Sequence, residues 1–427
     1  MSMDGQWDDW QSPAITQQDP VGDATSKLDL SQVDVTMRGA TLHARLTFDQ
    51  PLNLQSGPES DGTLRMTIGL PPTESEFDRR LNLDFRLRQA MLMSERRAAT
   101  AISWPELSFV AAPTFASRQV EMQCDLSPVN VAPGDVISVA FDQGDQLNDL
   151  MRLEVPKPMV ATPESVAIPE TEPQATRIIS FNTLHQGTCD PFRGPVLARM
   201  IEQTQPDIIC FNEEWEADLF QSGLGRVIPN VDEMQTHWHN GCAIATKGQC
   251  TPIPLDLPRA AVAVITLPDR DPLLVVSIHL KCCGYLGSEE DIQRIETMNA
   301  LTQKIKSLRR GDLGDEYRQL PIVVLGDFNL VGSDVPLSCL LDAGLSEVLP
   351  RSLIDQSTST WAAVDPAETF WPGRLDCIAV DQSRLEVLRS FLFDRVAFRQ
   401  TNPDWQGESV ASDHAALVLD VVLATLD

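Results

Sequence analysis

The chain has 427 residues, of which 42% are hydrophobic and 22% are charged, a composition typical of a soluble globular protein with more than one folded unit. Its formal net charge of −28 disfavours a protein that holds long nucleic acids by broad electrostatic attraction, since lysines and arginines normally supply the phosphate contacts. No apolar stretch is long enough to cross a bilayer, so we expect no transmembrane segment.

The compartment is left open by the sequence. The first thirty residues are acidic where a signal peptide needs a basic start and an apolar block. We therefore expect a cytoplasmic protein, or a secreted or periplasmic one if a leader was removed. Nine cysteines without a CxxC pair indicate neither a zinc site nor a complete disulfide framework, and we favour buried thiols over bridges.

Residues 1–154 are predicted to form an all-β sandwich that serves as an accessory domain. Apolar and polar side chains alternate with period two in 42–48, 64–70 and 120–124, and a short strand is expected over 136–141. Several short strands separated by turn residues are typical of a sandwich.

The opening of the chain adds a hint of a ligand for this domain. Asp4-Gly5-Gln6-Trp7-Asp8-Asp9-Trp10, followed by 19–23 and 29–30, resembles the start of secreted β-sandwich modules related to carbohydrate-binding domains. This resemblance implies a glycan or protein ligand. A stabilising sandwich without any ligand explains the same residues at least as well.

Residues 155–176 are predicted to be a semi-rigid linker, because five prolines interrupt any periodic pattern there. Residues 177–427 then read as an α/β domain. Strands are expected at 177–182, 207–211, 273–280, 322–325 and 415–423, and a short helix at 195–203. A longer helix is predicted to begin after a Ser288 cap, with an inner stripe of Ile292, Ile295, Met298, Ile305 and Leu308.

Polar side chains recur at the ends of these strands. Six motifs carry them, in this order: Asn182; Asn212-Glu213; His279; Gly326-Asp327-Phe328-Asn329; Arg374-Leu375-Asp376; and Ser412-Asp413-His414. Each motif alone has a structural explanation, such as an exposed loop carboxylate, a turn or a core histidine. Turn chemistry gives no reason for carboxylates and histidines to recur at successive strand ends, so the set favours a catalytic site.

In this order the motifs resemble the endonuclease/exonuclease/phosphatase superfamily, the fold of DNase I-like nucleases, neutral sphingomyelinases and inositol polyphosphate phosphatases. The resemblance covers 177–422 and implies a DNase I-like four-layer α/β sandwich. It implies metal ligands Glu213, Asp413 and Asn182, catalytic residues His279, Asp327, Asn329, Asp376 and His414, and substrate-binding residues Asn182, Lys281 and Arg374.

The implied roles are those of phosphoester hydrolysis with Mg²⁺ or Mn²⁺, hard cations that prefer oxygen ligands. Asp327 would orient or deprotonate the attacking water, and Asn329 would hold that carboxylate or a phosphate oxygen. His414 would bind the scissile phosphate, with Asp376 fixing its tautomer, and His279 would be the general acid.

Several residues leave alternatives open. Glu214 follows Glu213, so the choice of metal ligand between them is uncertain. Lys281 is equally well explained as a solvated strand-end lysine, and Trp371 either stacks on a base or sugar or packs internally. His185 and the pair at 237 and 239 lack a third ligand, and we favour surface or pocket-wall roles.

The leading hypothesis is a divalent-metal-dependent phosphodiester hydrolase, a nuclease first, with nucleic acid as its partner. The alternative is a sphingomyelinase or phosphomonoesterase of the same superfamily, which the acidic charge mildly favours. Against the inositol phosphatases, the segment 371–376 lacks their Trp-x-Asp-Arg arrangement. A third hypothesis, an inactive binding protein, is disfavoured by the retained carboxylates and histidines. Oligomeric state is not predicted.

Overall fold

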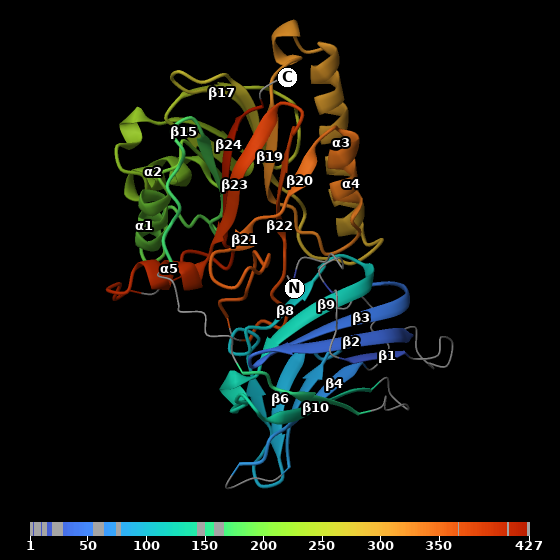
Figure 1. Ribbon diagram of the computed structural model, residues 1–427. Coiled ribbons are helices and arrows are strands. Elements are labelled where there is room, and N and C mark those ends of the chain that lie inside the picture. Colours follow the sequence, from blue (N-terminus) through green and yellow to red (C-terminus); the bar gives the residue numbers. More distant parts are fainter. Residues whose placement is uncertain are drawn as a thin grey trace.

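The computed structural model describes residues 3, 10, 15–18, 29–53, 64–73, 78–142, 150–157, 166–365, 367–407 and 410–424. Figure 1 shows an all-strand part built from the first third of the chain and a larger part in which helices flank central sheets. Most of the acidic opening segment, 4–9 and 19–23, and the middle of the predicted linker, 158–165, lie outside the described residues.

The all-strand part consists of two antiparallel sheets that share one apolar core. The first has the order β1 (Ile15–Gln18), β2 (Leu30–Arg38), β3 (Thr41–Leu52), β9 (Ser117–Asp125), β8 (Val110–Ala112). The second has the order β11 (Met151–Glu154), β10 (Val136–Asp142), β4 (Arg65–Leu70), β5 (Arg79–Asp84), β6 (Gln89–Ser94), β7 (Thr100–Ile102). We call these two sheets and their core the N-terminal sandwich.

The predicted alternation is confirmed in these strands. Along β4 every second side chain is buried, from Met66 through Ile68 to Leu70, because successive side chains of a strand point to opposite faces. The sandwich predicted for the first part of the chain is therefore present. A 3-10 turn, η1 (Ser127–Val129), connects β9 to β10.

The larger part is an α/β sandwich of four layers. One sheet has the order β14 (Gln235–His239), β15 (Gly241–Thr246), β13 (Ile208–Glu214), β12 (Thr176–Asn182), β24 (Ala416–Leu423), β23 (Leu385–Phe393), β21 (Arg351–Ser352). The other has the order β16 (Gln249–Pro252), β17 (Ala260–Thr266), β18 (Leu273–His279), β19 (Ile322–Asp327), β22 (Asp376–Val380), β20 (Ser346–Val348). The two sheets pack on each other through a shared core.

Helices cover the outer face of each sheet, as Figure 1 shows. The outer core of the first sheet includes side chains of α1 (Gly194–Thr204), α2 (Ala217–Val227) and α5 (Arg395–Thr401). The second sheet packs against α3 (Glu289–Arg310) and α4 (Val335–Asp342). Short turns η2 (Val231–Glu233) and η3 (Asp315–Tyr317) complete the elements. The predicted DNase I-like layering is confirmed.

The long helix differs from its prediction in one respect. Ser288 caps α3 and accepts a hydrogen bond from the Asp291 backbone N–H, as expected. However, Ile292 is 48% exposed, and Arg294 is fully buried instead. Arg294 can lie on the buried face of the helix because its guanidinium donates to the carbonyl oxygens of 281 and 283 in the loop beside the helix. In the part of the chain that is described, no helix is long and apolar enough to cross a membrane.

Strand pairing gathers the sequence motifs at one edge of the two sheets. The parallel pair β12 and β13 aligns Asn182 with Asn212, and the parallel pair β18 and β19 aligns His279 with Asp327. Antiparallel β22 begins where β19 ends, so Asp376 also lies opposite Asp327. The carboxyl ends of parallel strands meet at one edge, and this edge is where the polar side chains converge.

A buried ion pair ties the first and last strands of the four-layer part together. Arg177 on β12 lies opposite Asp420 on β24 and donates two hydrogen bonds to its carboxylate, each 2.7 Å long. Both side chains are at most 2% exposed, and Arg177 also donates to the carbonyl oxygen of Thr204. Removing one partner leaves the other charge buried and uncompensated.

We therefore expect Asp420→Ala to lower the free energy of unfolding by about 3–5 kcal/mol, measured by urea denaturation. The exposed pair Arg310 and Asp312 is the matched control, and Asp312→Ala should change stability by less than about 1 kcal/mol. If both replacements lowered the free energy of unfolding equally, burial of the Arg177–Asp420 pair would not be the reason for its effect.

Candidate active site at the strand ends

Glu213 faces the site because a β-bulge turns it out of the ladder. The register of β13 against β15 shifts between Asn212 and Glu214, and Glu213 has a left-handed backbone with a φ of 65°. A bulge re-aims the side chain at the extra residue. In a regular strand, Glu213 and Glu214 would point to opposite faces of the sheet, and neither side chain would be directed toward the edge where the motifs meet.

Glu214 belongs to a different environment and is fully buried. Its carboxylate accepts hydrogen bonds from the hydroxyls of Thr183 and Thr188 and from the Thr188 backbone N–H. Burial raises the pKa of Glu214 above its ordinary value, although these hydrogen bonds act in the opposite direction. Of the two glutamates, Glu213 is the one that lies among the other motif residues.

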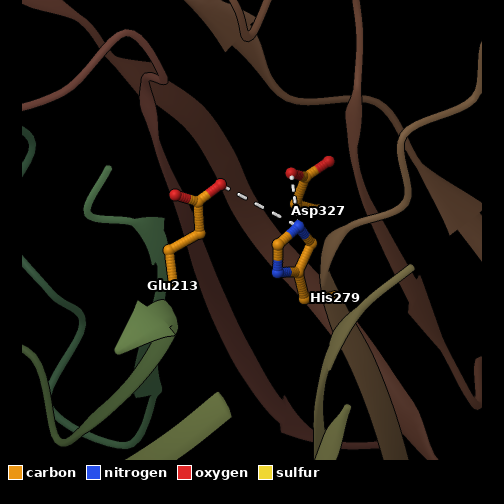
Figure 2. A group of neighbouring side chains, drawn as sticks. All are labelled: Glu213, His279 and Asp327. Atoms are coloured by element: carbon orange, nitrogen blue, oxygen red, sulfur yellow. Dashed lines mark ion pairs between the residues drawn. The ribbon is translucent and has the colours of Figure 1, made fainter. Parts of the chain in front are cut away.

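Three of the motif residues form a cluster, drawn in Figure 2. The Nε2 atom of His279 lies 3.4 Å from Asp327 Oδ2 and 4.0 Å from Glu213 Oε1. Asn182 joins the two carboxylates, because its amide nitrogen donates to Glu213 Oε1 at 3.1 Å and to Asp327 Oδ2 at 3.0 Å. One atom from each of Glu213, His279 and Asp327 lies within 4.8 Å of the others, close enough to share a metal ion.

Asn182 differs from the role expected for it as a metal ligand. Its amide oxygen accepts a hydrogen bond from the Leu184 backbone N–H, and its nitrogen faces the carboxylates. In this arrangement Asn182 is a donor that holds Glu213 and Asp327 together. A ligand role would require the amide to rotate and the hydrogen bond to Leu184 to break.

Asp327 also belongs to a second cluster, with Asp376 and His414. His414 Nδ1 lies 2.7 Å from Asp376 Oδ2, and both side chains are buried. Since the carboxylate accepts the Nδ1 proton, the opposite ring nitrogen faces the site, with Nε2 at 3.8 Å from Asp327 Oδ2. Asp327 therefore lies between the two histidines.

The pKa values of His414 and Asp327 in this second cluster are both raised, but for different reasons. Burial by itself would lower the pKa of His414, but the carboxylates of Asp376 and Asp327 outweigh it and raise the pKa to about 10. Burial, together with the Asp376 charge, raises the pKa of Asp327 to about 7, although His414 opposes the shift. These shifts favour the imidazolium form of His414, and Asp327 holds a proton more readily than an ordinary aspartate.

His279 has the opposite character. Arg259 Nη2 lies 3.2 Å from His279 Nδ1, and because a guanidinium only donates, Nδ1 is the acceptor and the ring proton is on Nε2. Burial, and then the charges of Arg259 and His414, hold the pKa of His279 well below its ordinary value. His279 thus presents a neutral N–H toward Asp327, which is a weaker proton donor than the imidazolium that a general acid usually provides.

The neighbours of His279 were not found from the sequence. The Trp215 ring packs against the imidazole with centroids 5.4 Å apart, and the Arg259 guanidinium lies over that indole at 4.7 Å. Trp215 follows directly after the two glutamates, which was its only signal. Arg259 lies in a loop with no motif around it.

Asn329 and Gly326 shape the loop that carries Asp327. The Asn329 backbone N–H donates to Asp327 Oδ1 at 3.0 Å, and its side chain donates to the Leu280 carbonyl oxygen at 3.3 Å. Gly326 has a φ of 144°, and a Cβ there would lie 1.9 Å from the Ile278 carbonyl oxygen. Only glycine allows β19 to approach β18 this closely.

Asp413 lies beside the second cluster and outside the first. Its carboxylate accepts from the Trp361 indole N–H at 2.9 Å and from the Ser412 hydroxyl at 3.2 Å, and Oδ1 is 3.9 Å from His414 Nε2. Among the described residues, neither of the two groups that could share a metal ion includes Asp413. The two carboxylates best placed to share a metal ion are therefore those of Glu213 and Asp327, and not that of Asp413.

The predicted substrate-binding residues are distributed unevenly. Arg374 is 9% exposed and forms an ion pair with Glu347 on β20, and its role in substrate binding stays a prediction. Lys281 is half-buried beyond the end of β18, and its charge contributes to the low pKa of His279. His185 is 77% exposed and its Nδ1 atom lies 3.6 Å from Glu213 Oε2, which agrees with a pocket-wall position.

Residues 179–414 match the profile of the Endonuclease/Exonuclease/phosphatase family. The match covers more than half of the chain, and the chain therefore belongs to this family. Members of the family are hydrolases that act on phosphoester bonds and depend on divalent metals. No curated protein matches the chain.

Solved structures of similar arrangement include three from different organisms. D. rerio TDP2 complexed with single strand DNA product is 15% identical, covering 58% of this chain and 98% of that chain with a TM-score of 0.41. AP endonuclease LMAP from Leishmania major is 13% identical, covering 58% and 88% with a TM-score of 0.41. A Staphylococcus aureus beta toxin mutant with bound magnesium ions is 14% identical, covering 57% and 99% with a TM-score of 0.38.

The raised pKa of His414 makes a prediction about stability and pH in metal-free protein. Between the ordinary value of 6.5 and about 10, the folded chain keeps a proton that the unfolded chain has lost, so this contribution to stability falls as pH rises. We expect urea unfolding to show a larger loss of stability from pH 7 to pH 9.5 in the parent than in His414→Gln. Equal losses in the two proteins would show that His414 is not held protonated by the fold.

Proposed function

We propose that this protein is a divalent-metal-dependent phosphodiester hydrolase that acts on nucleic acid. The observation that carries the proposal is the position of the Asp327 carboxylate, shared between a cluster suited to a metal and a cluster that holds an imidazolium. Family membership supplies the reaction class, hydrolysis of a phosphoester bond.

The donor set of the first cluster fits a hard cation. Glu213 and Asp327 offer carboxylate oxygens, and Mg²⁺ or Mn²⁺ needs only one or two carboxylates because it retains water and substrate oxygens as further ligands. Glu213 is assigned as the principal ligand, with Asp327 beside it. A bound cation would polarise the phosphoryl oxygen and offset the charge that develops on it.

The residues of the chain then divide the proton chemistry. Asp327 orients the attacking water and accepts its proton. His414 remains charged and binds the scissile phosphate, while Asp376 fixes its orientation. The neutral Nε2–H of His279 donates a hydrogen bond to a phosphate or leaving oxygen.

A phosphoesterase acting on lipid or small substrates, a sphingomyelinase or phosphomonoesterase, is the second candidate. The net charge of −28 favours it, because a long polyanion is repelled by the acidic surface. A panel of plasmid, single-stranded DNA, sphingomyelin vesicles, inositol polyphosphates and bis-p-nitrophenyl phosphate separates the two. Cleavage of lipid or small esters alone would exclude the nuclease and retain the hydrolase.

Metal dependence gives the first test of the site. EDTA should abolish hydrolysis and added Mg²⁺ or Mn²⁺ should restore it, and Glu213→Gln should raise the metal concentration needed for half-maximal rate by about 10-fold or more. Glu216→Gln, just beyond the strand end at the start of α2, is the matched control and should leave that concentration unchanged. Activity that persists in EDTA would contradict the proposal.

The proton-transfer residues give the second test. Asp327→Asn and His414→Gln should each lower kcat by about 10²–10⁴-fold, since each removes a group placed to move or stabilise charge in the reaction. His239→Gln alters an exposed histidine on β14 and should keep kcat within about twofold. Retention of the parent rate in His414→Gln would remove the catalytic role assigned to the second cluster.

A further inference from the structure

One residue of the family region belongs to the core of the N-terminal sandwich. Trp371 is fully buried, and every other residue of that core within the described chain lies between Leu30 and Val155. Its ring meets Phe85 at 5.1 Å, Phe109 at 5.5 Å and Trp104 at 6.2 Å, each in an edge-on arrangement. Trp371 therefore packs internally, and the alternative of stacking on a substrate base or sugar is wrong.

The backbone around Trp371 is held by the same sandwich. The Trp104 indole N–H donates to the Thr369 carbonyl oxygen at 3.3 Å, and the Ala111 backbone N–H donates to the Pro372 carbonyl oxygen at 3.1 Å. The segment leading to the Asp376 motif is therefore fixed by contacts on either side of the buried indole.

A single threonine of the sandwich joins this segment to the loop after β19. The buried Thr114 hydroxyl lies 2.6 Å from the Leu330 carbonyl oxygen and 2.9 Å from the Arg374 carbonyl oxygen, and its one proton is shared between them. Leu330 follows Asn329 directly in the sequence. Thr114 therefore touches the chain next to two of the strand-end motifs at once.

Further hydrogen bonds connect this segment to the residues of the site. The Leu375 carbonyl oxygen accepts from the backbone N–H groups of Phe328 and Asn329, and the Thr360 hydroxyl accepts from those of Leu375 and Asp376. The course of the chain at 374–376 thus determines both the loop that holds Asp327 and the carboxylate that binds His414.

We propose that the N-terminal sandwich is a positioning element of the active site, acting through Trp371 and Thr114 on the Asp376–His414 pair and the Asp327 loop. Neither residue touches the reacting groups, so both are positioning residues. The catalytic consequence rests on the proposed function. The structural consequence, the placement of Asp376 against His414, stands apart from it.

Thr114→Val provides the sharpest test because it removes one hydroxyl at nearly constant volume. We expect kcat to fall about 10-fold with KM within about twofold, and Thr114→Ser to restore most of the rate. Thr302→Val is the matched control, since its buried hydroxyl also donates to a carbonyl oxygen between two elements, that of Cys339 at 2.8 Å, away from the site. A Thr114→Val rate equal to that of Thr302→Val would overturn the catalytic part of the proposal.

A second measurement does not depend on activity. The Nδ1 proton of His414, in its 2.7 Å hydrogen bond to Asp376, should give a downfield NMR signal that disappears in His414→Gln. We expect this signal to shift or broaden in Thr114→Val and in Trp371→Phe, and to stay unchanged in Thr302→Val. If the parent cleaves no phosphoester, the proposed function fails, and the NMR comparison still decides the inference. An unchanged signal in both sandwich-contact variants would overturn it.

Discussion

The buried carboxylate of Asp327 is the constraint on which the site depends. It is 2% exposed and lies where β18, β19 and β22 run side by side in register. A carboxylate taken out of water needs hydrogen bonds and opposite charge, or it takes up a proton. Asn182, the backbone N–H of Asn329 and the His414 ring meet that need from three different segments of the chain.

This requirement explains why residues far apart in sequence occur together. Each partner of Asp327 must itself be held, so Asn182 binds Leu184, and His414 binds Asp376. The arrangement also keeps two histidines in different states at one pH, because one is beside Arg259 and the other beside a carboxylate. Because Asp376 stabilises a positive charge and Arg259 opposes one, the His414 ring can carry charge while the His279 ring donates a neutral N–H.

Much of the fold was predictable because the physical signals are local. Alternating apolar and polar residues predicted β4, and a continuous apolar run predicted β18. Ser288, with Asp291 three residues further on, predicted the start of α3. The clustering of the motifs was predictable as well, since strand ends meet at a sheet edge. Ile292 was misplaced because helical periodicity does not show that a buried Arg294 has carbonyl partners in a neighbouring loop.

The details of the site depended on contacts that no local pattern encodes. The bulge that turns Glu213 outward requires β15 as a partner, and the ion pair of Arg374 requires Glu347 on another strand. Arg259 sets the tautomer of His279 from a loop twenty residues away. The division into domains at 154 and 176 remains a prediction. Contacts cross it, because Trp371 of the larger part lies in the core of the N-terminal sandwich.

The burial of Trp371 in the sandwich core has a consequence for the order in which the chain folds. During synthesis the strands β2 to β11 leave the ribosome before Trp371, so the core of the sandwich cannot be complete until that indole has also been made. The rings of Phe85, Trp104 and Phe109 gain their contact with Trp371 only from a segment that comes much later in the chain. The sandwich reaches its final packing only when the segment leading to the active site has been made.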